Sequence, residues 1–296
     1  SPGGGARAPG GEAARAGPSR GGGPRPGDAE HGSGLPRARR GDRPPGAGPR
    51  MRLKLIRCEI FYREMCAAVA RSPHQVDIEF LTKGLHDIGG AGMCERLQAA
   101  VDKVDESRYE VVLLGYALCG NGLAGLTARS LPLVLPRGHD CMTLFLGSRQ
   151  RYQDYFQNNP GVYFKTSGWI ERGKNLDQLG YSSAKTGIGL SFEELVAKYG
   201  EDNAQYLWEQ LGGYTKNYRK LTFIEMGIEP DGRFERQTQG EAAARNMEYE
   251  KIPGDMTLIE RLVHGNWDED GFLIVPPGHR IVARYDETIV GVEKAP

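Results

Sequence analysis

The sequence lacks any long hydrophobic run: no stretch approaches the roughly 18 consecutive apolar residues that a membrane-spanning helix requires. An excess of charge of either sign is also missing, because 38 basic side chains balance 38 acidic ones. We therefore predict no membrane span and no general electrostatic attraction to nucleic acid or to an anionic membrane. The pattern G-x-x-x-x-G-K-[ST] is absent as well, which excludes a P-loop nucleotide site.

The first 50 residues contain no aromatic residue and only one large aliphatic residue, Leu35, whereas 24 of them are glycine or proline. Such a segment cannot bury enough apolar surface to offset the entropy lost on ordering. We therefore expect residues 1–50 to be a disordered tail, and one interpretation is translated upstream sequence with Met51 as the natural start. An alternative is an Arg/Gly/Pro arm that contacts RNA, although no aromatic residue is interleaved with the arginines.

Cysteine is scarce and odd in number, and neither a signal peptide nor a transit peptide is recognisable. A disulfide framework is therefore not expected, and reduced thiols in a cytoplasmic protein fit better. Two of the five thiols, Cys66 and Cys94, fall inside predicted helices and are expected to be core residues. The five are Cys58, Cys66, Cys94, Cys119 and Cys141.

The remaining 246 residues alternate between apolar runs of strand length and segments with helical spacing. This alternation predicts an α/β fold, with mostly parallel sheets, helices on both faces and two Rossmann-like halves. The halves are expected at about 51–170 and 220–290, with a helical insertion at about 171–219 and a final hairpin after residue 279. The predicted strands are 52–58, 76–81, 110–115, 131–136, 161–166, 221–227, 248–252 and 271–277.

Cysteine and histidine gather where the predicted strands end. Cys58 ends the first strand, Cys119 follows the third, and His139 and Cys141 follow the fourth. Ligands of open parallel sheets bind outside the carboxyl ends of the strands, and thiolate and imidazole are the ligands that zinc prefers. We therefore predict a zinc site from Cys58, Cys119, His139 and Cys141. Two alternatives stay open: inert buried thiols, or a metal-free thiol nucleophile with His139 as its base.

Three other residues are candidates from their positions. His86 follows the second strand just before a glycine-rich helix start, where backbone amides can hold an anion, although turn chemistry explains it as well. Trp169 lies near a strand end and predicts an aromatic pocket wall, with aromatic core as the alternative. Glu225 ends the strand after the insertion. The G-x-G-x-x-G match that begins at Gly120 follows its strand too loosely for a dinucleotide site, and we interpret it as a glycine-rich loop.

Several long phrases resemble one family. They are GYALCGNGL, LPRGHDCMTLFLGSR, NPGVYFKTSGWIE, KYGEDNAQYLWE and VPPGH. Together they resemble the prokaryotic "domain of unknown function 1638" family, from about Met51 to His279. The resemblance implies an association with corrinoid-dependent methyl transfer and one-carbon metabolism. Its pattern includes Cys58, His86, Cys119, Asn121, Arg137, His139, Asp140, Cys141 and Trp169.

These observations lead to two functional hypotheses. The first is a zinc-dependent transferase of methyl or other one-carbon groups, in which Asp140 or His86 orients a ligand or moves a proton and Arg137 holds an anionic substrate group. Asn121, Trp169 and Glu225 would contact the substrate. The second is a non-catalytic accessory protein that binds a metal, a corrinoid or a small molecule. The expected partners are a small-molecule substrate or a corrinoid protein, and a homo-oligomer is a further expectation; nucleic acid and membranes are not expected.

Overall fold

The computed structural model describes residues 50–172, 192–212 and 218–296. The predicted tail therefore lies outside the described residues, except for its last position. Parts of the predicted helical insertion, residues 173–191 and 213–217, lie outside them too. The described part of the insertion is helical, as expected, and forms α6 (Phe192–Tyr199) and α7 (Glu201–Gly212).

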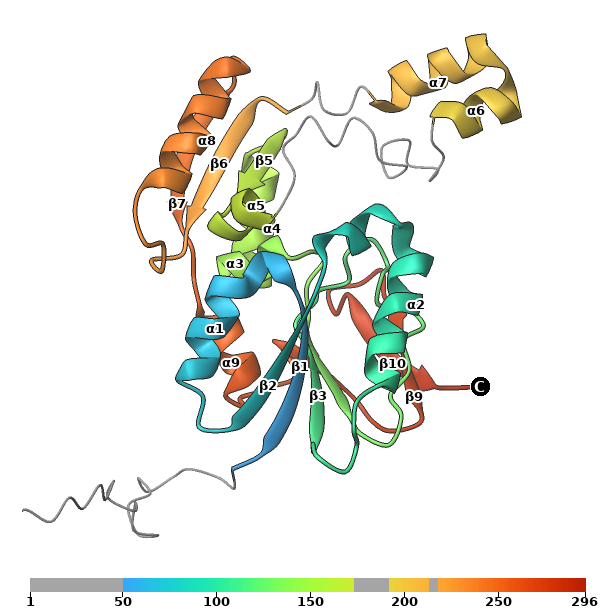
Figure 1. Ribbon diagram of the computed structural model, residues 1–296, viewed down its shortest axis with the longest axis vertical. Helices are drawn as coiled ribbons and strands as arrows, with labels where there is room; N and C mark the ends of the chain where they lie inside the picture. Colours follow the sequence, from blue (N-terminus) through green and yellow to red (C-terminus); the bar gives the residue numbers. More distant parts are fainter. Residues whose placement is uncertain (1–49, 173–191, 213–217) are drawn as a thin grey trace, which may run out of the picture. The chain divides into compact units, whose positions relative to one another are not determined.

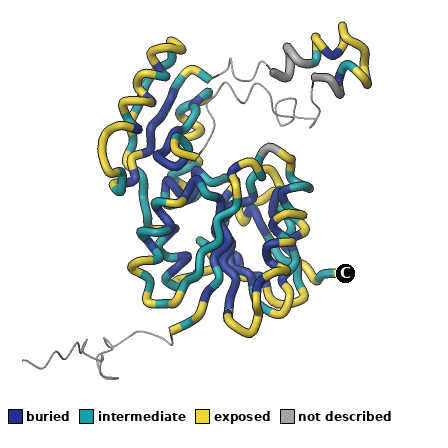
Figure 2. Tube along the Cα trace, in the orientation of Figure 1, coloured by how far each residue is buried: buried dark blue, intermediate teal, exposed yellow. Residues whose placement is uncertain are grey.

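A five-stranded sheet with the order β2-β1-β3-β4-β8 forms the centre of the fold (Figure 1). The first four strands run parallel, and β8 pairs antiparallel with β4. The strands are β1 (Arg52–Cys58), β2 (Gln75–Leu81), β3 (Val111–Leu114), β4 (Leu133–Pro136) and β8 (Phe272–Val275). All residues of β3 and β4 are buried, which explains why these strands read as continuous apolar runs (Figure 2).

Helices cover both faces of this sheet, as predicted (Figure 1). The helices α1 (Tyr62–Ala70) and α9 (Thr257–Val263) contact each other on one face, and α2 (Gly89–Asp102) covers the other. Each helix turns its apolar residues toward the sheet, and these residues join the strands in one hydrophobic core. None of the described helices is long and apolar enough to cross a membrane.

A second sheet has three parallel strands in the order β5-β6-β7. Its strands are β5 (Val162–Lys165), β6 (Lys220–Glu225) and β7 (Glu248–Pro253), and α8 (Arg233–Ala244) packs on the last two. The two predicted halves therefore exchange a strand each: β5 joins the second sheet, and β8 returns to the first. An apolar run identifies a strand but does not identify its neighbour, so the arrangement into two Rossmann-like halves is not confirmed.

Short elements complete the described chain. Two helices rather than one follow β4, because Gly147 has a φ of 76° and Ser148 caps the second helix by accepting a hydrogen bond from the Arg151 amide. The predicted final hairpin is present as β9 and β10. The elements are η1 (Glu59–Phe61), η2 (Lys83–Asp87), α3 (Met142–Leu146), α4 (Arg149–Asn158), α5 (Ser167–Arg172), β9 (His279–Ala283) and β10 (Val290–Lys294).

Candidate functional site

The strand order creates a switch point between β1 and β3. The chain leaves β1 for β2 on one side of it and then crosses to β3 on the other side. Open α/β sheets bind ligands outside the carboxyl ends of the strands at such a point. Cys58 ends β1. Gly115 directly follows β3 and lies beside the end of β1, since its amide donates a hydrogen bond to the Ile56 carbonyl over 2.9 Å. The predicted edge of the sheet is therefore the place where a ligand site is expected on topological grounds.

Arg57 occupies the centre of this edge and is 0% exposed. Its guanidinium carbon lies 3.3 Å from the centroid of the Phe61 ring, which stacks on Phe145. A Cβ atom on Gly115 would lie 2.3 Å from Arg57 Cδ, so a glycine is required there. Within the described residues, Arg57 Nε and Nη2 have no hydrogen-bond partner. Burial lowers the pKa of Arg57 to about 10.

Arg57 was not among the predicted site residues, although the sequence carries a signal for it. Side chains alternate between the two faces of a strand, so Leu53, Leu55 and residue 57 share one face of β1. The first two are leucines with no exposure, and the third position on that face carries a guanidinium. A charged residue at the apolar position beside a strand's carboxyl end therefore indicated a buried polar site.

Three of the predicted metal ligands come together around Arg57. Cys58 is 2% exposed, and Cys119 and Cys141 are half-buried. Two backbone hydrogen bonds of 2.9 Å join the loops that carry Cys119 and Cys141. The Cys119 amide donates to the His139 carbonyl, and the Leu118 amide donates to the carbonyl of residue 138. Burial raises the pKa of all three thiols, that of Cys119 to about 12, and the nearby Arg57 cation opposes each rise. The three thiols are therefore protonated at neutral pH.

The loop after β3 has a strained backbone at two residues that are not glycine. Cys119 has a φ of 46° and Asn121 a φ of 67°, both in the left-handed region. Such conformations persist where the surroundings fix them, and they cluster at functional sites. A Cβ on Gly122 would lie 2.4 Å from Met93 Sδ, so the glycine-rich loop closely approaches α2. The close approach here is to a core side chain of α2.

His139 and Asp140 follow β4 but contact different groups. Asp140 accepts hydrogen bonds from the Met142 amide over 2.9 Å and from the Tyr152 hydroxyl over 2.7 Å, while burial raises its pKa. His139 is exposed and lines a cavity of about 830 Å³. Leu118 and Asn121, on either side of Cys119, line the same cavity. The loop that carries Cys119 therefore forms part of the cavity wall.

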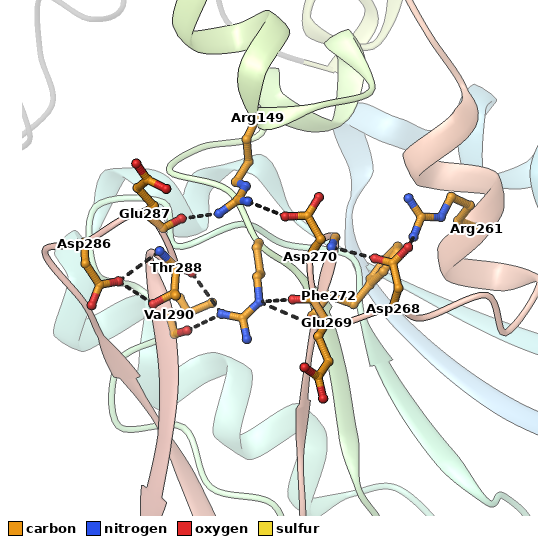
Figure 3. A network of polar contacts seen from close by, with 12 residues as sticks. Arg149, Arg261, Asp268, Glu269, Asp270, Phe272, Asp286, Glu287, Thr288 and Val290 are labelled. Atoms are coloured by element: carbon orange, nitrogen blue, oxygen red, sulfur yellow. Dashed lines mark hydrogen bonds and ion pairs between the residues drawn. The ribbon is translucent and has the colours of Figure 1, made fainter.

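A polar network that includes Asp270 and Glu287 lies beside this cavity (Figure 3), and its hydrogen bonds make Arg137 a member of it. The Arg137 guanidinium donates to four backbone carbonyls, those of Glu269, Phe272, Thr288 and Val290. Arg149 joins the same region by an ion pair of 2.7 Å with Asp270 and by a hydrogen bond to the Glu287 carbonyl. Arg137 thus holds the β9–β10 hairpin against the segment before β8. These contacts give it a structural role that the prediction of an anion-binding residue did not include.

Glu225 also lies apart from the thiols in its contacts. It ends β6, is exposed, and lies 3.3 Å from Lys251 Nζ. Its backbone carbonyl accepts a hydrogen bond of 2.7 Å from the Gly254 amide. These contacts belong to the three-stranded sheet.

Lys83, His86 and Trp169 lie beyond the ends of β2 and β5. Lys83 is 8% exposed, and its Nζ lies 5.2 Å from the centroid of the Trp169 ring. Its backbone amide donates to Glu59 Oε1 over 2.9 Å. His86 follows in the same short 3-10 helix and is half-buried. Lys83 is a second residue that the sequence analysis missed, since no motif distinguishes a lysine in a turn.

A metal ion would need at least three ligands directed at one point. The three thiols have the right chemistry for zinc. Among the described residues, however, no group of three or more His, Cys, Asp or Glu side chains is arranged to hold a metal ion. The side chains as placed do not fit a zinc site, and we derive no step through a metal. Zinc binding stays a prediction.

Comparison with known proteins gives one finding. The family model described as "Protein of unknown function (DUF1638)" matches residues 80–263. The matched segment includes every predicted site residue except Cys58. Curated proteins give no match to this chain.

Proposed function

The chain belongs to the DUF1638 family of proteins of unknown function, and from the site we propose that it is an enzyme that transfers a methyl or other one-carbon group at sulfur. One observation carries the proposal. Three thiols from the ends of β1, β3 and β4 meet around the buried cation of Arg57, at the switch point of an open α/β sheet. Sulfur nucleophiles next to a fixed cation suit the acceptance of an alkyl group.

We assign the acceptor role to Cys119. Its neighbours Leu118 and Asn121 line the cavity of about 830 Å³, whereas Cys58 is 2% exposed. In the proposed step a proton passes from the thiol to solvent, and the sulfur lone pair forms a bond to the methyl carbon. The bond from that carbon to its donor breaks, and the electron pair stays on the donor. A methylated corrinoid, entering as a substrate, is the donor class that the family resemblance implies.

Arg57 supports this step electrostatically. Its cation lowers the pKa of the Cys119 thiol against the effect of burial. The enclosed position strengthens this influence, because buried charges are poorly screened by solvent. Arg57 is therefore a positioning and stabilising residue in the proposal.

A second candidate function is binding without turnover. It is favoured by the raised pKa of all three thiols, of which Cys119 reaches about 12. A protonated thiol is a weak nucleophile, so the same residues would suit an accessory protein that holds a small molecule. Transfer and binding can be separated by experiment.

The proposal is tested by incubating the full chain with methylcobalamin in the dark. We expect the cobalt–carbon absorbance to decay and the protein mass to rise by one methyl group in place of one hydrogen, with peptide mapping placing the methyl on Cys119. Cys119→Ala should abolish the gain. The matched control is Cys66→Ala, which removes a half-buried thiol on α1 and should leave the gain intact.

The other outcomes are equally informative. If methylcobalamin stabilises the protein against heat without transferring a methyl group, the accessory-protein function replaces the enzyme. If it neither transfers nor stabilises, the corrinoid part of the proposal is wrong.

Elemental analysis of the same preparation, purified without a metal-binding tag, tests the zinc prediction. About one zinc ion per chain, lost in Cys119→Ala, is the result that the prediction requires.

A further inference from the structure

Buried hydrogen-bond donors without an acceptor collect beside the thiols. Within the described part of the chain, the side chains with such atoms include Arg57, Tyr116, Ser167 and Trp169. Three of them are at most 2% exposed, and Trp169 is half-buried. A buried donor without an acceptor destabilises the fold by about 1–3 kcal/mol, and a charged one by more. Several together indicate a site built for an acceptor.

These donors belong to elements that pack closely on one another. The backbone of α5 touches η1, since a Cβ on Gly168 would lie 1.6 Å from the Ile60 carbonyl oxygen. Ser167 and Trp169 flank that glycine. The η1 segment directly follows Arg57 and Cys58 and carries Phe61, the ring under the guanidinium. The element that carries Ser167 and Trp169 therefore packs directly on the segment that follows Arg57.

Lys83 adds a second cation to this group. It is 8% exposed, and its Nζ lies 5.2 Å from the centroid of the Trp169 ring. Both Lys83 and Arg57 lower the pKa of Cys58, while burial raises it. Two buried cations thus act on the same thiol from two strand ends.

The nearby acids do not balance these cations. One carboxylate oxygen of Glu59 accepts a hydrogen bond from the Lys83 backbone amide, and the other lies 3.7 Å from Arg172 Nη1. Asp140 is bound to Tyr152 and to a backbone amide. Glu64 is 0% exposed, and burial raises its pKa to about 7, so it carries only part of a charge at neutral pH. Among the side chains that the structure describes, the donor cluster of Arg57, Lys83, Tyr116, Ser167 and Trp169 therefore has an unmatched positive charge.

We propose that this donor cluster binds an oxyanion group of the substrate, a carboxylate or a phosphate, at the carboxyl ends of β1 and β2. The planar guanidinium of Arg57 accepts such a group through two nitrogens, and Lys83 adds a point charge. The hydroxyl and indole donors fix its orientation. An anion held there lies next to Cys58 and anchors the substrate beside the thiols. This assignment of substrate class rests on the proposed function, but the binding itself does not.

The test measures binding to the full chain by isothermal titration and by thermal unfolding. Sodium acetate and sodium phosphate are the probes, at constant ionic strength kept with chloride. We expect saturable binding of at least one probe, and its identity tells carboxylate from phosphate. Lys83→Gln should weaken binding about tenfold, and Lys83→Arg should restore most of it. Trp169→Phe should weaken it severalfold, because it removes one donor and keeps the ring.

The matched control is Lys103→Gln, an exposed lysine at the end of α2, which should bind as the wild type does. The proposal is overturned if neither probe binds saturably, or if Lys83→Gln binds as well as the control. Arg57→Met should abolish binding; if it does not fold, the Lys83 and Trp169 variants still decide.

Failure of this inference can be told from failure of the proposed function. Cys119→Ala should stop methyl transfer and leave anion binding unchanged, because Cys119 is outside the donor cluster. Anion binding without any methyl transfer supports the cluster and removes the enzyme. Methyl transfer without anion binding supports the enzyme and overturns the assignment of the donor cluster as an anion site.

Discussion

Lys165 and Arg57 are both buried cations near the end of a strand, but they differ in their partners. Lys165 ends β5 in the three-stranded sheet, is 3% exposed, and lies 2.9 Å from Glu241. Arg57 precedes the end of β1 in the five-stranded sheet and has no ion pair within the described residues. A buried charge is strongly unfavourable unless it is paired. The small sheet thus satisfies its buried charge internally, and the large sheet keeps one unsatisfied at the edge where open α/β sheets generally bind ligands.

The same contrast extends to the surroundings of each sheet. In the small sheet Lys220 lies 3.1 Å from Glu250, and the Tyr155 hydroxyl donates to that carboxylate over 2.6 Å. At the edge of the large sheet Tyr116 is buried and its hydroxyl has no partner in the part of the chain that the structure describes. Residues that stabilise a fold find partners within it, whereas residues that serve a ligand leave part of their bonding capacity unused.

The largest effect is expected where α5 packs on η1. Gly168→Ala places a methyl group against the Ile60 carbonyl oxygen, 1.6 Å away, and neither backbone can yield locally. We expect the free energy of unfolding to fall by about 3 kcal/mol or more, measured by urea denaturation.

The control for that variant is Gly240→Ala in α8. No atom lies within 4 Å of the added Cβ there, so stability should rise by up to about 1 kcal/mol. Equal effects of the two substitutions would show that the contact between α5 and η1 is not tight, and would weaken the case for the donor cluster.

An intermediate effect is expected from pH. Burial raises the pKa of Glu64 to about 7 from 4.5; Glu229 adds to the rise, and Arg57 and Arg63 oppose it. Between pH 4.5 and about 7, the folded state therefore binds more protons than the unfolded state. The stabilising contribution of Glu64 is complete below pH 4.5. The free energy of unfolding should fall by up to about 3 kcal/mol as the pH rises to about 7 and beyond.

Glu64→Gln isolates this contribution, because the amide does not titrate. Urea denaturation from pH 5 to pH 8 should give a flatter dependence for the variant than for the wild type. Parallel curves would contradict the assignment and place a charged, partnered carboxylate at residue 64.

The smallest effect is expected in the small sheet. Lys251 lies 3.3 Å from Glu225 and 3.1 Å from Glu235, but all three side chains are partly exposed. Lys251→Met should lower the free energy of unfolding only slightly, and added salt should reduce even that difference. A loss of several kcal/mol, unaffected by salt, would mean that this sheet also depends on a strong charge pair.

Much of the fold could be predicted because buried strands read as apolar runs. The ends of β1, β3 and β4 followed from that pattern, and with them the meeting of Cys58, Cys119 and Cys141. Which strand pairs with which could not be predicted, because β5 and β8 read equally well as members of either sheet. The roles of Arg137 and Arg57 depend on carbonyls and rings that are remote in sequence, such as Val290.

The pairing of β8 with β4 has a consequence for how the chain folds. These neighbours, Leu133–Pro136 and Phe272–Val275, are separated by the whole three-stranded sheet, so closing their pairing joins very distant parts of the sequence. Non-local pairing of this kind slows folding, because the entropy of a long loop is lost before the contact forms. During synthesis the apolar edge of β4 stays unpaired until β8 leaves the ribosome, and in that interval it is the segment of the large sheet most exposed to aggregation and to chaperones.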